Sequence, residues 1–444
     1  MEPIKRRSFL KSTTATGVAL GAPAIRSGWA QNSPNNRLNV CVVGLRGRGR
    51  AHIQNFNTIK NTQVTALCDV DENLFFKSMD LVDLGPGGED PKTYVDFREM
   101  LENKDIDIVS IATPDHWHAL QTIWACQAGK DVYIEKPLSY TIQEGRKMIE
   151  AARKYKRIVQ IGTQHPSDQV TQKALEFVHS GELGELYMGK AVVYDYRAEI
   201  GHKPDTEIPD GVDWDLYLGP APYRPFNENR FHYNWHWFWD TTTTEFGNNG
   251  THWIDLIRRA MQKREHPVEV QCMGGVYAID TDRQVPNVEA AHLKYADGKM
   301  LQLEVRNLYT NKEGCPSDRH NLLFGSKGWM WMSTSKWAAF FGKDNEPGPA
   351  MTANDIPAAE RVNSTLAHFT NFVECVGTRR FEDQVADIAE GHYSSVISHL
   401  GNIAYRTGRR LHFNPYAEKF INDADADSYL SRVYRPPYTL PAEV

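Results

Sequence analysis

Cysteine is scarce in this sequence of 444 residues, and no two cysteines form a C-x-x-C pair. We therefore expect no disulfide framework, because such frameworks use closely and regularly spaced cysteines. Most of the cysteines lie in apolar segments, which is typical of buried thiols in a protein that folds in a reducing compartment. They are Cys41, Cys68, Cys126, Cys272, Cys315 and Cys375.

The sequence also lacks long hydrophobic runs and strongly basic segments. No apolar stretch reaches about 18 residues, so we expect no stable membrane span. The net charge of −6, with no basic run after the N-terminal segment, argues against a general nucleic-acid binder. The hydrophobic fraction of 41% and the charged fraction of 24% are those of a globular protein, and the length allows two domains.

Residues 1–30 have the successive parts of an export signal. Arg6 and Arg7 precede Ser-Phe-Leu-Lys, a short interrupted apolar run follows, and small residues stand three and one positions before Gln31. This order resembles a twin-arginine signal peptide, whose export machinery carries folded proteins. It predicts export to the periplasm or beyond, with residues 31–37 as a polar linker. The alternative is a basic N-terminal tail.

Residues 38–165 alternate between short apolar strands and helices. Because the strands are almost continuously apolar, we expect helices to cover both faces of their sheet, as in a parallel sheet. The first domain is therefore predicted to be a doubly wound α/β domain with a parallel sheet. The strands are expected at 38–44, 63–69, 106–113, 131–137 and 157–164, and the helices at 45–56, 116–129 and 141–156.

Residues 166–415 are predicted to form a second α/β domain with a large, mostly antiparallel open sheet. In the segment 300–306 apolar and polar residues alternate, so one face of that strand is apolar. The Asp-Gly pair at 296–299 predicts a hairpin turn. Residues 416–444 are predicted to be a tail on the surface. Strands are expected at 187–197, 268–278, 289–297, 299–308, 319–326 and 328–333, and helices at 364–377 and 388–408.

The first predicted strand ends in a glycine-rich turn that opens a helix, which is the pattern of a dinucleotide-binding site. Gly44 allows the tight turn and Gly49 lets the helix approach the strand, so that backbone N–H groups face a pyrophosphate. Arg46 replaces the middle glycine of the pattern and Gly47 follows it, so Arg46 is a candidate phosphate contact. Asp69, 20 residues past Gly49, is placed to bind the adenosine ribose and to favour NAD over NADP.

Glu135, Lys136 and Pro137 stand at the carboxyl end of a predicted parallel strand. Ligands bind at that edge of such sheets. Burial and neighbouring charges can lower the pKa of a lysine there, so that it exchanges protons with a substrate hydroxyl. The alternative is a lysine that closes a salt bridge at the end of the strand.

These residues and the segments around them resemble the Gfo/Idh/MocA oxidoreductases, the family of glucose–fructose oxidoreductase and inositol dehydrogenase. The likeness covers essentially the whole chain after residue 30. The resemblance implies a Rossmann domain followed by an α/β domain with a large open sheet, which many members use to form homo-oligomers. The matching segments are 42–52, 66–72, 111–119, 133–139, 160–164, 214–232, 235–255 and 399–415.

The resemblance assigns two catalytic residues. In the family, the lysine corresponding to Lys136 lies near the nicotinamide and the substrate and assists proton transfer. A D-x-G-x-H motif, which contacts the substrate hydroxyl, corresponds to residues 248–252. His252 is retained, but Asn248 replaces the aspartate and cannot take a proton. We therefore expect Lys136 and His252 to share the acid–base work, with Asp255 able to orient His252.

The resemblance also extends the candidate binding residues. His116 and His118 are two positions apart and do not face each other on a helix, so we expect no metal site. The aromatic run at 231–239 is either a platform for a sugar ring or part of the core. The candidate cofactor-binding residues are Gly44, Arg46, Gly47, Gly49, Asp69, Thr113, Pro114, His116, Glu135, Lys136 and Gln164. The candidate substrate-binding residues are Asn248, Tyr196, Arg197, Trp239, Asp240 and Arg306.

The export signal and the nucleotide site together bear on function. Because no pool of nicotinamide nucleotide is maintained in the periplasm, we expect an exported protein to acquire its cofactor before export and to hold it tightly. The sequence predicts an NAD(P)-dependent oxidoreductase acting on a hydroxyl of a sugar or glycoside. Two alternatives are an NAD-dependent glycosidase, working by oxidation, elimination, hydration and reduction, and a non-catalytic sugar-binding protein. The sequence leaves open the sugar, the carbon and the oligomeric state.

Overall fold

The computed structural model describes residues 37–444, except for 86–87, 310–311 and 316. The predicted twin-arginine signal at 1–30 lies outside the described residues, as does the predicted linker up to residue 36. None of the helices in this part of the chain is long and apolar enough to cross a bilayer. All six cysteines are free, and all but Cys315 are buried.

In the described chain, the first sheet has six parallel strands in the order β3-β2-β1-β4-β5-β6. This confirms the predicted doubly wound parallel sheet. Its strands are β1 Leu38–Val43, β2 Thr62–Cys68, β3 Lys92–Tyr94, β4 Ile108–Ile111, β5 Asp131–Ile134 and β6 Val159–Ile161. The helices of this region are α1 Gly47–Thr58, α2 Phe75–Met79, α3 Phe97–Glu102, α4 His118–Gln127 and α5 Ile142–Lys154.

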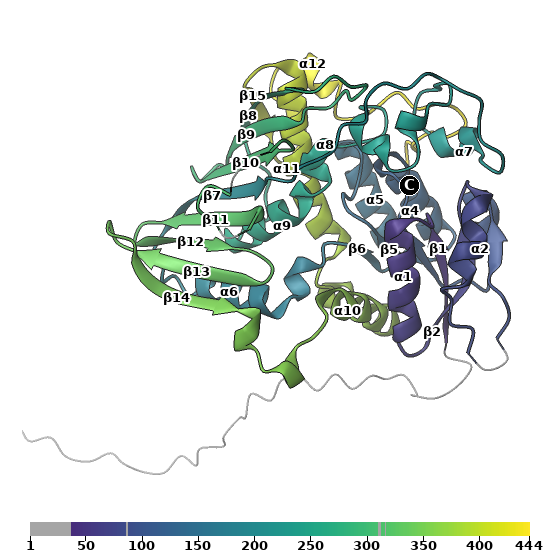
Figure 1. Ribbon diagram of the computed structural model, residues 1–444, viewed down its shortest axis with the longest axis horizontal. Coiled ribbons are helices and arrows are strands. Elements are labelled where there is room, and N and C mark those ends of the chain that lie inside the picture. Colours follow the sequence, from purple (N-terminus) through teal and green to yellow (C-terminus); the bar gives the residue numbers. More distant parts are fainter. Residues whose placement is uncertain (1–36, 86–87, 310–311, 316) are drawn as a thin grey trace, which may run out of the picture.

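Helices cover both faces of the parallel sheet. Helices α3, α4 and α5 bury one face. The other face packs against α1 and against α10, Ser364–Thr378, which comes from a much later part of the chain (Figure 1). The predicted helix at 141–156 is α5, and Thr141 caps it because its side chain accepts from the backbone N–H of Glu144.

The second sheet has ten strands in the order β14-β13-β12-β11-β7-β10-β9-β8-β15-β16 within the described residues. All pairs are antiparallel except β7 with β10, which confirms the predicted mostly antiparallel sheet. The strands are β7 Leu186–Val193, β8 Glu269–Gly275, β9 Val288–Lys294, β10 Met300–Arg306, β11 Arg319–Gly325, β12 Gly328–Met332, β13 Lys336–Phe341, β14 Glu346–Thr352, β15 Leu411–Asn414 and β16 Lys419–Phe420.

Three helices lie on the inner face of this sheet, between it and the parallel sheet (Figure 1). They are α6 Gln169–His179, α9 Gly250–Ala260 and α11 Ile388–Thr407. The turn predicted at 296–299 joins β9 to β10 as an antiparallel pair. The short helices are α7 Trp214–Leu218, α8 Thr244–Gly247 and α12 Ala424–Asp427.

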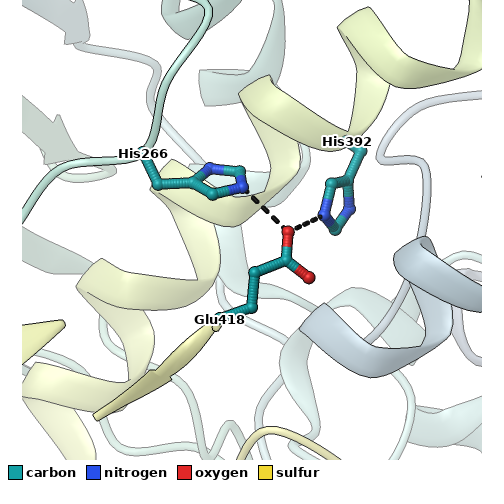
Figure 2. Close-up of side chains that lie close together, drawn as sticks. All are labelled: His266, His392 and Glu418. Carbon is teal, nitrogen blue, oxygen red and sulfur yellow. Dashed lines mark hydrogen bonds and ion pairs between the residues drawn. The ribbon is translucent and has the colours of Figure 1, made fainter. Parts of the chain in front are cut away.

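A buried ionic cluster fixes the turn between β15 and β16 to the helices (Figure 2). The Glu418 carboxylate lies 2.9 Å from Nε2 of His266 and 2.7 Å from Nε2 of His392 on α11. Arg146 on α5 donates to both oxygens of the same carboxylate. The charge of Glu418 is thereby balanced by an arginine, and its charge-assisted hydrogen bonds tie three elements together.

The segment 428–440 runs back over the first domain. The backbone N–H of Gln143 donates to the carbonyl of Leu430, and the Tyr434 hydroxyl donates to Glu144. The ring of Tyr438 meets that of Trp117 edge to face, 5.4 Å between centroids. The last part of the chain therefore completes the surface of the parallel-sheet domain.

Candidate active site

A cavity of about 740 Å³ lies between the two sheets of the protein. Residues that follow β1, β2, β4, β5 and β6 line one side, because the carboxyl ends of parallel strands meet at one edge of the sheet. The α8–α9 junction and the segment after β7 line the other side. The cavity is therefore shared between the predicted nucleotide-binding part and the predicted substrate-binding part.

The glycine-rich turn forms one end of this cavity. Gly44 has φ +84°, and a Cβ there would lie 2.7 Å from the carbonyl oxygen of Ala112. A Cβ at Gly49 would lie 1.7 Å from the carbonyl oxygen of Gly44, so α1 packs directly on the turn. These two positions accept only glycine, as predicted from the pattern.

The start of α1 is free to take an anion. Within the described residues, Arg46 at the N-cap makes no side-chain capping hydrogen bond, and the first turn holds no acidic residue. A Cβ at Gly47 would meet none of the described atoms within 4 Å, so the backbone there is open to a ligand. Free N–H groups at a helix start suit a pyrophosphate, and the site thus fits a dinucleotide.

Asp69 lies beside this turn. Its carboxylate accepts from the backbone N–H of Leu45 at 2.6 Å and of Asp71 at 3.0 Å. Burial raises its pKa to about 6, although these two hydrogen bonds act in the opposite direction. Near neutral pH the group is therefore a carboxylate held in place at the cavity wall.

Glu135 is the centre of a second polar group. It accepts from Arg48 at 2.9 Å, from Gln164 at 3.4 Å, and lies 3.1 Å from Nε2 of His52. Burial alone would raise the pKa of Glu135, but Arg48 and His52 lower it well below its usual value. The carboxylate next to Lys136 is therefore charged at neutral pH.

Lys136 projects into the cavity, where its Nζ donates to Oδ1 of Asn248 at 2.8 Å. Burial lowers the pKa of Lys136, while the carboxylates of Glu135 and Asp115 oppose that change. The structure thus brings together the lysine and the asparagine that the sequence assigned to different motifs.

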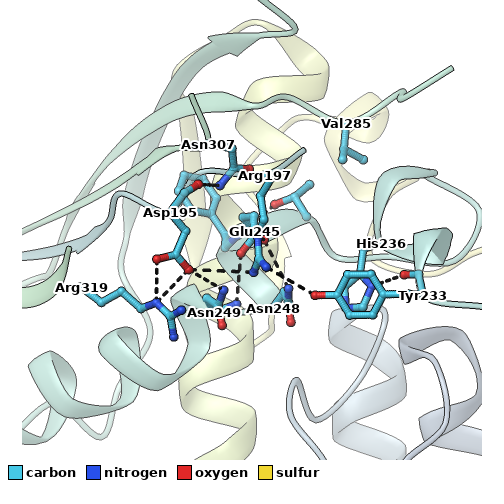
Figure 3. Close-up of polar contacts among 12 residues, drawn as sticks. Asp195, Arg197, Tyr233, His236, Glu245, Asn248, Asn249, Val285, Asn307 and Arg319 are labelled. Atoms are coloured by element: carbon cyan, nitrogen blue, oxygen red, sulfur yellow. Dashed lines mark hydrogen bonds and ion pairs between the residues drawn. The ribbon is translucent and has the colours of Figure 1, made fainter. Parts of the chain in front are cut away.

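Glu245 fixes the orientation of the Asn248 amide (Figure 3). The Asn248 Nδ2 group donates to Oε1 of Glu245 at 3.3 Å, and Arg197 donates to the same oxygen at 2.9 Å. Because the Nδ2 side of the amide is taken by a carboxylate, its Oδ1 side faces Lys136. The lysine therefore meets a neutral acceptor at this point.

His252 also lines the cavity. Its ring stacks on that of His165, 4.6 Å between centroids. Burial, and then the nearby His165 and Lys136, lower the pKa of His252 well below its usual value, so its ring is neutral. The Asp255 carboxylate bonds to Arg258, Arg259 and Ser394, and no hydrogen bond joins it to His252 among the described residues.

Most candidate cofactor residues line the cavity. Two do not: Gly49 supports the turn from behind, and His116 is buried with Nε2 3.0 Å from the carbonyl oxygen of Tyr217. The candidates in the lining are Gly44, Arg46, Gly47, Asp69, Thr113, Pro114, Glu135, Lys136 and Gln164.

Of the candidate substrate residues, Asn248 and Arg197 line the cavity and four others lie outside its lining. Trp239 stacks on Tyr405, Asp240 pairs with Arg224 and Arg230, and Arg306 pairs with Glu304 and Glu313, while Tyr196 is half exposed.

The cavity also contains polar residues that the sequence did not single out. Asp195 joins two of them, accepting from Asn249 at 3.1 Å and from Arg319 at 2.8 Å (Figure 3). Asn249 lies inside the motif at 248–252, so its position in the cavity was predictable from the sequence. Asp195 lies two residues past the end of β7 and Arg319 begins β11, and the pairing of these two strands brings them together.

Two family models match the chain. One, described as an oxidoreductase family with an NAD-binding Rossmann fold, matches residues 38–163. The other, the C-terminal alpha/beta domain of an oxidoreductase family, matches residues 178–327 and 350–440. Together they cover the parallel sheet and most of the larger sheet, while β12 and β13 fall between the matched segments.

Individual relatives are more distant. Glycosyl hydrolase family 109 protein 1 of Shewanella sp. strain MR-4 is 26% identical over 228 residues, which is 46% of this chain and 50% of that protein. The chain thus spans about half the length of the curated relatives it matches. A similar protein from Saccharopolyspora erythraea is 26% identical over 51% of this chain and 56% of its own length.

Solved structures share the fold. The WlbA dehydrogenase of Bordetella pertussis, solved with NADH and UDP-GlcNAcA, has a TM-score of 0.62 at 17% identity, covering 85% of this chain and 99% of that one. The aldose-aldose oxidoreductase of Caulobacter crescentus, solved with glycerol, has a TM-score of 0.63 at 20% identity, covering 85% and 100%.

Proposed function

Because the chain belongs to the Gfo/Idh/MocA oxidoreductase family, we propose that it moves hydride between NAD and a hydroxyl-bearing carbon of a sugar or glycoside. One observation carries the proposal. The Lys136 amine lies in the cavity between the glycine-rich turn and Asn248, and burial lowers its pKa. An amine of lowered pKa at this place is suited to take a proton from a substrate hydroxyl.

The residues divide the work as follows. NAD, when bound, supplies the hydride acceptor. Neutral Lys136 takes the hydroxyl proton as the carbon is oxidised, and gives it back when a carbonyl is reduced. Asn248 Oδ1 accepts a hydrogen bond from the resulting ammonium and cannot itself take the proton. The neutral ring of His252 holds the substrate oxygen from the α9 side.

The charges of the cavity favour an uncharged substrate. Arg197 pairs with Glu245, Arg48 with Glu135 and Arg319 with Asp195, so each of these arginines already has a carboxylate partner. A substrate acid or phosphate would have to share one of these arginines with a carboxylate that repels it. We propose that the substrate is a neutral sugar or a neutral glycoside.

The part of the cavity beside Asp69, where the adenosine ribose is expected to bind, favours NAD over NADP. A 2′-phosphate beside the Asp69 carboxylate would meet a negative charge that two backbone N–H groups hold in place. A ribose hydroxyl instead donates to that carboxylate.

The proposed location rests on the N-terminal sequence, and the proposed assembly rests on exposed residues of the larger sheet. The twin-arginine pattern at 1–30 supports export of a folded protein that carries its nucleotide. Exposed apolar side chains on the larger sheet, including Tyr187, Met273 and Met300, support self-association through that sheet. We propose a periplasmic homo-oligomer with tightly held NAD.

A second candidate is hydrolysis of a glycoside by transient oxidation. The curated relatives favour it, because they are described as glycosyl hydrolase family 109 proteins. Oxidation acidifies the neighbouring C–H, elimination then releases the leaving group, and hydration and reduction restore the sugar. The same lysine and the same cofactor serve both reactions, and only the products differ.

The test starts from purified mature protein with nothing added. Denaturation is expected to release NAD or NADH, and a panel of neutral sugars and their methyl glycosides is expected to reduce the bound NAD. A keto-sugar product identifies the oxidoreductase, and free sugar without net redox change identifies the glycosidase. Protein that releases no nucleotide and binds none when NAD is added contradicts both.

Lys136→Met, which removes the amine at nearly constant size, separates chemistry from binding. It is expected to slow reduction of the bound NAD by about 100-fold or more while the nucleotide remains bound. Lys190→Met, which removes an ion-paired lysine outside the cavity, is the matched control and is expected to react at the normal rate. Normal turnover in Lys136→Met would exclude the lysine from the mechanism.

A further inference from the structure

A second cavity, of about 540 Å³, lies beside the first. All of its lining comes from the segment between β7 and α8. Arg197 and Tyr233 line both cavities, so these two side chains form part of the wall that the cavities share.

Of the two side chains shared by both cavities, Arg197 is held by an ion pair and Tyr233 is not. Nε of Arg197 is bonded to Glu245, while its Nη1 group reaches the Tyr233 hydroxyl at 3.4 Å, near the limit for a hydrogen bond. Tyr233 is 53% exposed. Figure 3 shows Tyr233 extending from the right of the view with its hydroxyl toward Arg197, while Asn248 and Asn249 lie below Arg197 and Glu245. The arginine is thus fixed, and the tyrosine is the part that a ligand can move.

The lining of the second cavity contains both aromatic rings and hydrogen-bonding groups. Tyr196 is 51% exposed and is held by stacking on Tyr309, with 4.4 Å between the ring centroids. Phe231 and Trp237 add two more rings, and Asn229 and Asn234 add amides. Sugar rings present C–H faces to aromatic rings and hydroxyls to amides, so this lining suits a carbohydrate.

Two cations and two carboxylates line the second cavity, so its charges cancel: Arg197, Lys203, Glu199 and Glu228. Lys203 lies 3.3 Å from Glu228, and Arg197 is paired with Glu245. Neither cation is left to select an anion. The preferred ligand is therefore uncharged, like the substrate proposed for the first cavity.

From these observations we propose that the second cavity is a binding subsite for the group attached to the reacting sugar, a second neutral sugar unit or the aglycone of a glycoside. This proposal rests on the function proposed above. It makes the natural substrate a glycoside or oligosaccharide, with its reacting ring beside Lys136 and its next unit between Tyr196 and Tyr233.

Ala198→Trp tests the subsite by filling it. Ala198 is exposed and lines the second cavity but not the first. The probes are glucose, galactose and N-acetylglucosamine, each as the free sugar, the 4-nitrophenyl glycoside and a disaccharide. The variant is expected to lower the efficiency of bound-NAD reduction by the glycosides and disaccharides about ten-fold, because stacking contacts are lost. The free sugars are expected to react as with the original protein.

Ala359→Trp is the matched control, since Ala359 is exposed and lies outside both cavities. It is expected to leave the ratio of glycoside to free-sugar efficiency unchanged. The same ratio in Ala198→Trp as in the control overturns the subsite, even if the protein oxidises sugars. If no probe reduces the bound NAD, the proposed function fails instead, and calorimetric binding of the disaccharides to both variants then decides the subsite by the same comparison.

Discussion

At the scale of single residues, the partner of Lys136 bears on the charge state of its amine. A lysine that faces a carboxylate is held in its charged form, because the opposite charge raises its pKa. Here the nearest partner is the neutral amide of Asn248, turned by Glu245 so that its oxygen faces the amine. The ammonium therefore loses part of the stabilisation that an aspartate would give it, and the neutral amine is available nearer to neutral pH.

Asn248→Asp is expected to move the pH profile toward alkaline pH. The rate of bound-NAD reduction by a sugar rises with pH as Lys136 loses its proton, so its midpoint follows the pKa of the lysine. The introduced carboxylate replaces the amide oxygen that lies 2.8 Å from Nζ of Lys136. Because its negative charge favours the ammonium, the midpoint is expected to rise by about one pH unit or more.

Asn248→Ala is the control for this prediction. It removes the acceptor without adding charge, so the midpoint is expected to stay or to fall, because the ammonium loses a hydrogen bond. Upward shifts of equal size in both variants would show that Lys136 does not sense the charge at position 248. The repulsion between the introduced carboxylate and Glu245 is removed by repeating the measurement in a Glu245→Gln background.

At the scale of elements, the contact of α1 with the turn after β1 decides whether the nucleotide site forms. Gly49 brings the helix against the Gly44 carbonyl, while Gly47 one half-turn earlier faces open space. Gly49 thus allows the helix to pack on the turn, and Gly47 leaves the backbone accessible to the nucleotide.

Gly49→Ala is expected to lower the free energy of unfolding by about 2 kcal/mol, because its Cβ would overlap the Gly44 carbonyl and push α1 from the sheet. The purified variant is expected to lack nucleotide. Gly47→Ala adds a methyl group where none of the described atoms is near, so its stability is expected to be unchanged and only its nucleotide affinity to fall. Urea unfolding and nucleotide release measure the two effects. Equal stability of both variants would contradict the packing argument.

The helices and strands also show which parts of the fold can be predicted from the sequence. The apolar strands of the first domain, the capping residue Thr141 and the glycine turn were predictable because their signals are local. Strand β14 was not predicted, since its residues Pro347, Gly348 and Pro349 are poor strand formers that only an edge position tolerates. Helix α10 was predicted as a helix, but its place on the first sheet depends on distant contacts of Phe369 and Phe372.

The same limit applies to the site. Lys136 and Asn248 each lie in a recognisable motif, whereas their hydrogen bond joins positions 112 residues apart. Trp239 and Arg306 have suitable side chains for sugar binding, and both lie instead in contacts outside the cavity lining. Residue type and spacing indicate which groups are available, but the fold decides which of them meet.

At the scale of the whole molecule, buried histidines link stability to pH. Burial lowers the pKa of many of them, to about 3 for His116, His236 and His399, and to about 4 for His165, His232, His368 and His392. In the unfolded chain these groups have ordinary pKa values near 6.5. Between about pH 6.5 and pH 4 the unfolded state therefore binds more protons than the folded state.

The protein is therefore expected to lose stability as the pH falls from about 6.5 toward 4, each such histidine costing up to about 1.4 kcal/mol per pH unit in that window. Urea midpoints measured at intervals across it give the slope. His399→Gln is expected to reduce the slope, because the amide does not titrate and still offers Ser139 a hydrogen-bonding group. His412→Gln, at an exposed position, is expected to leave it unchanged. A flat profile in the original protein would contradict the argument.

The contacts of segment 428–440 have a consequence for how the molecule is made. Trp117 and Leu120 belong to an apolar cluster that Tyr438 completes, and the start of α5 is bonded to Leu430 and Tyr434. During translation the ribosome delivers these partners roughly 300 residues after the strands they cover, so a nascent chain has an unfinished first domain. Because Trp117 also lines the cavity, the nucleotide site reaches its final surroundings only after the last residues of the chain have been made.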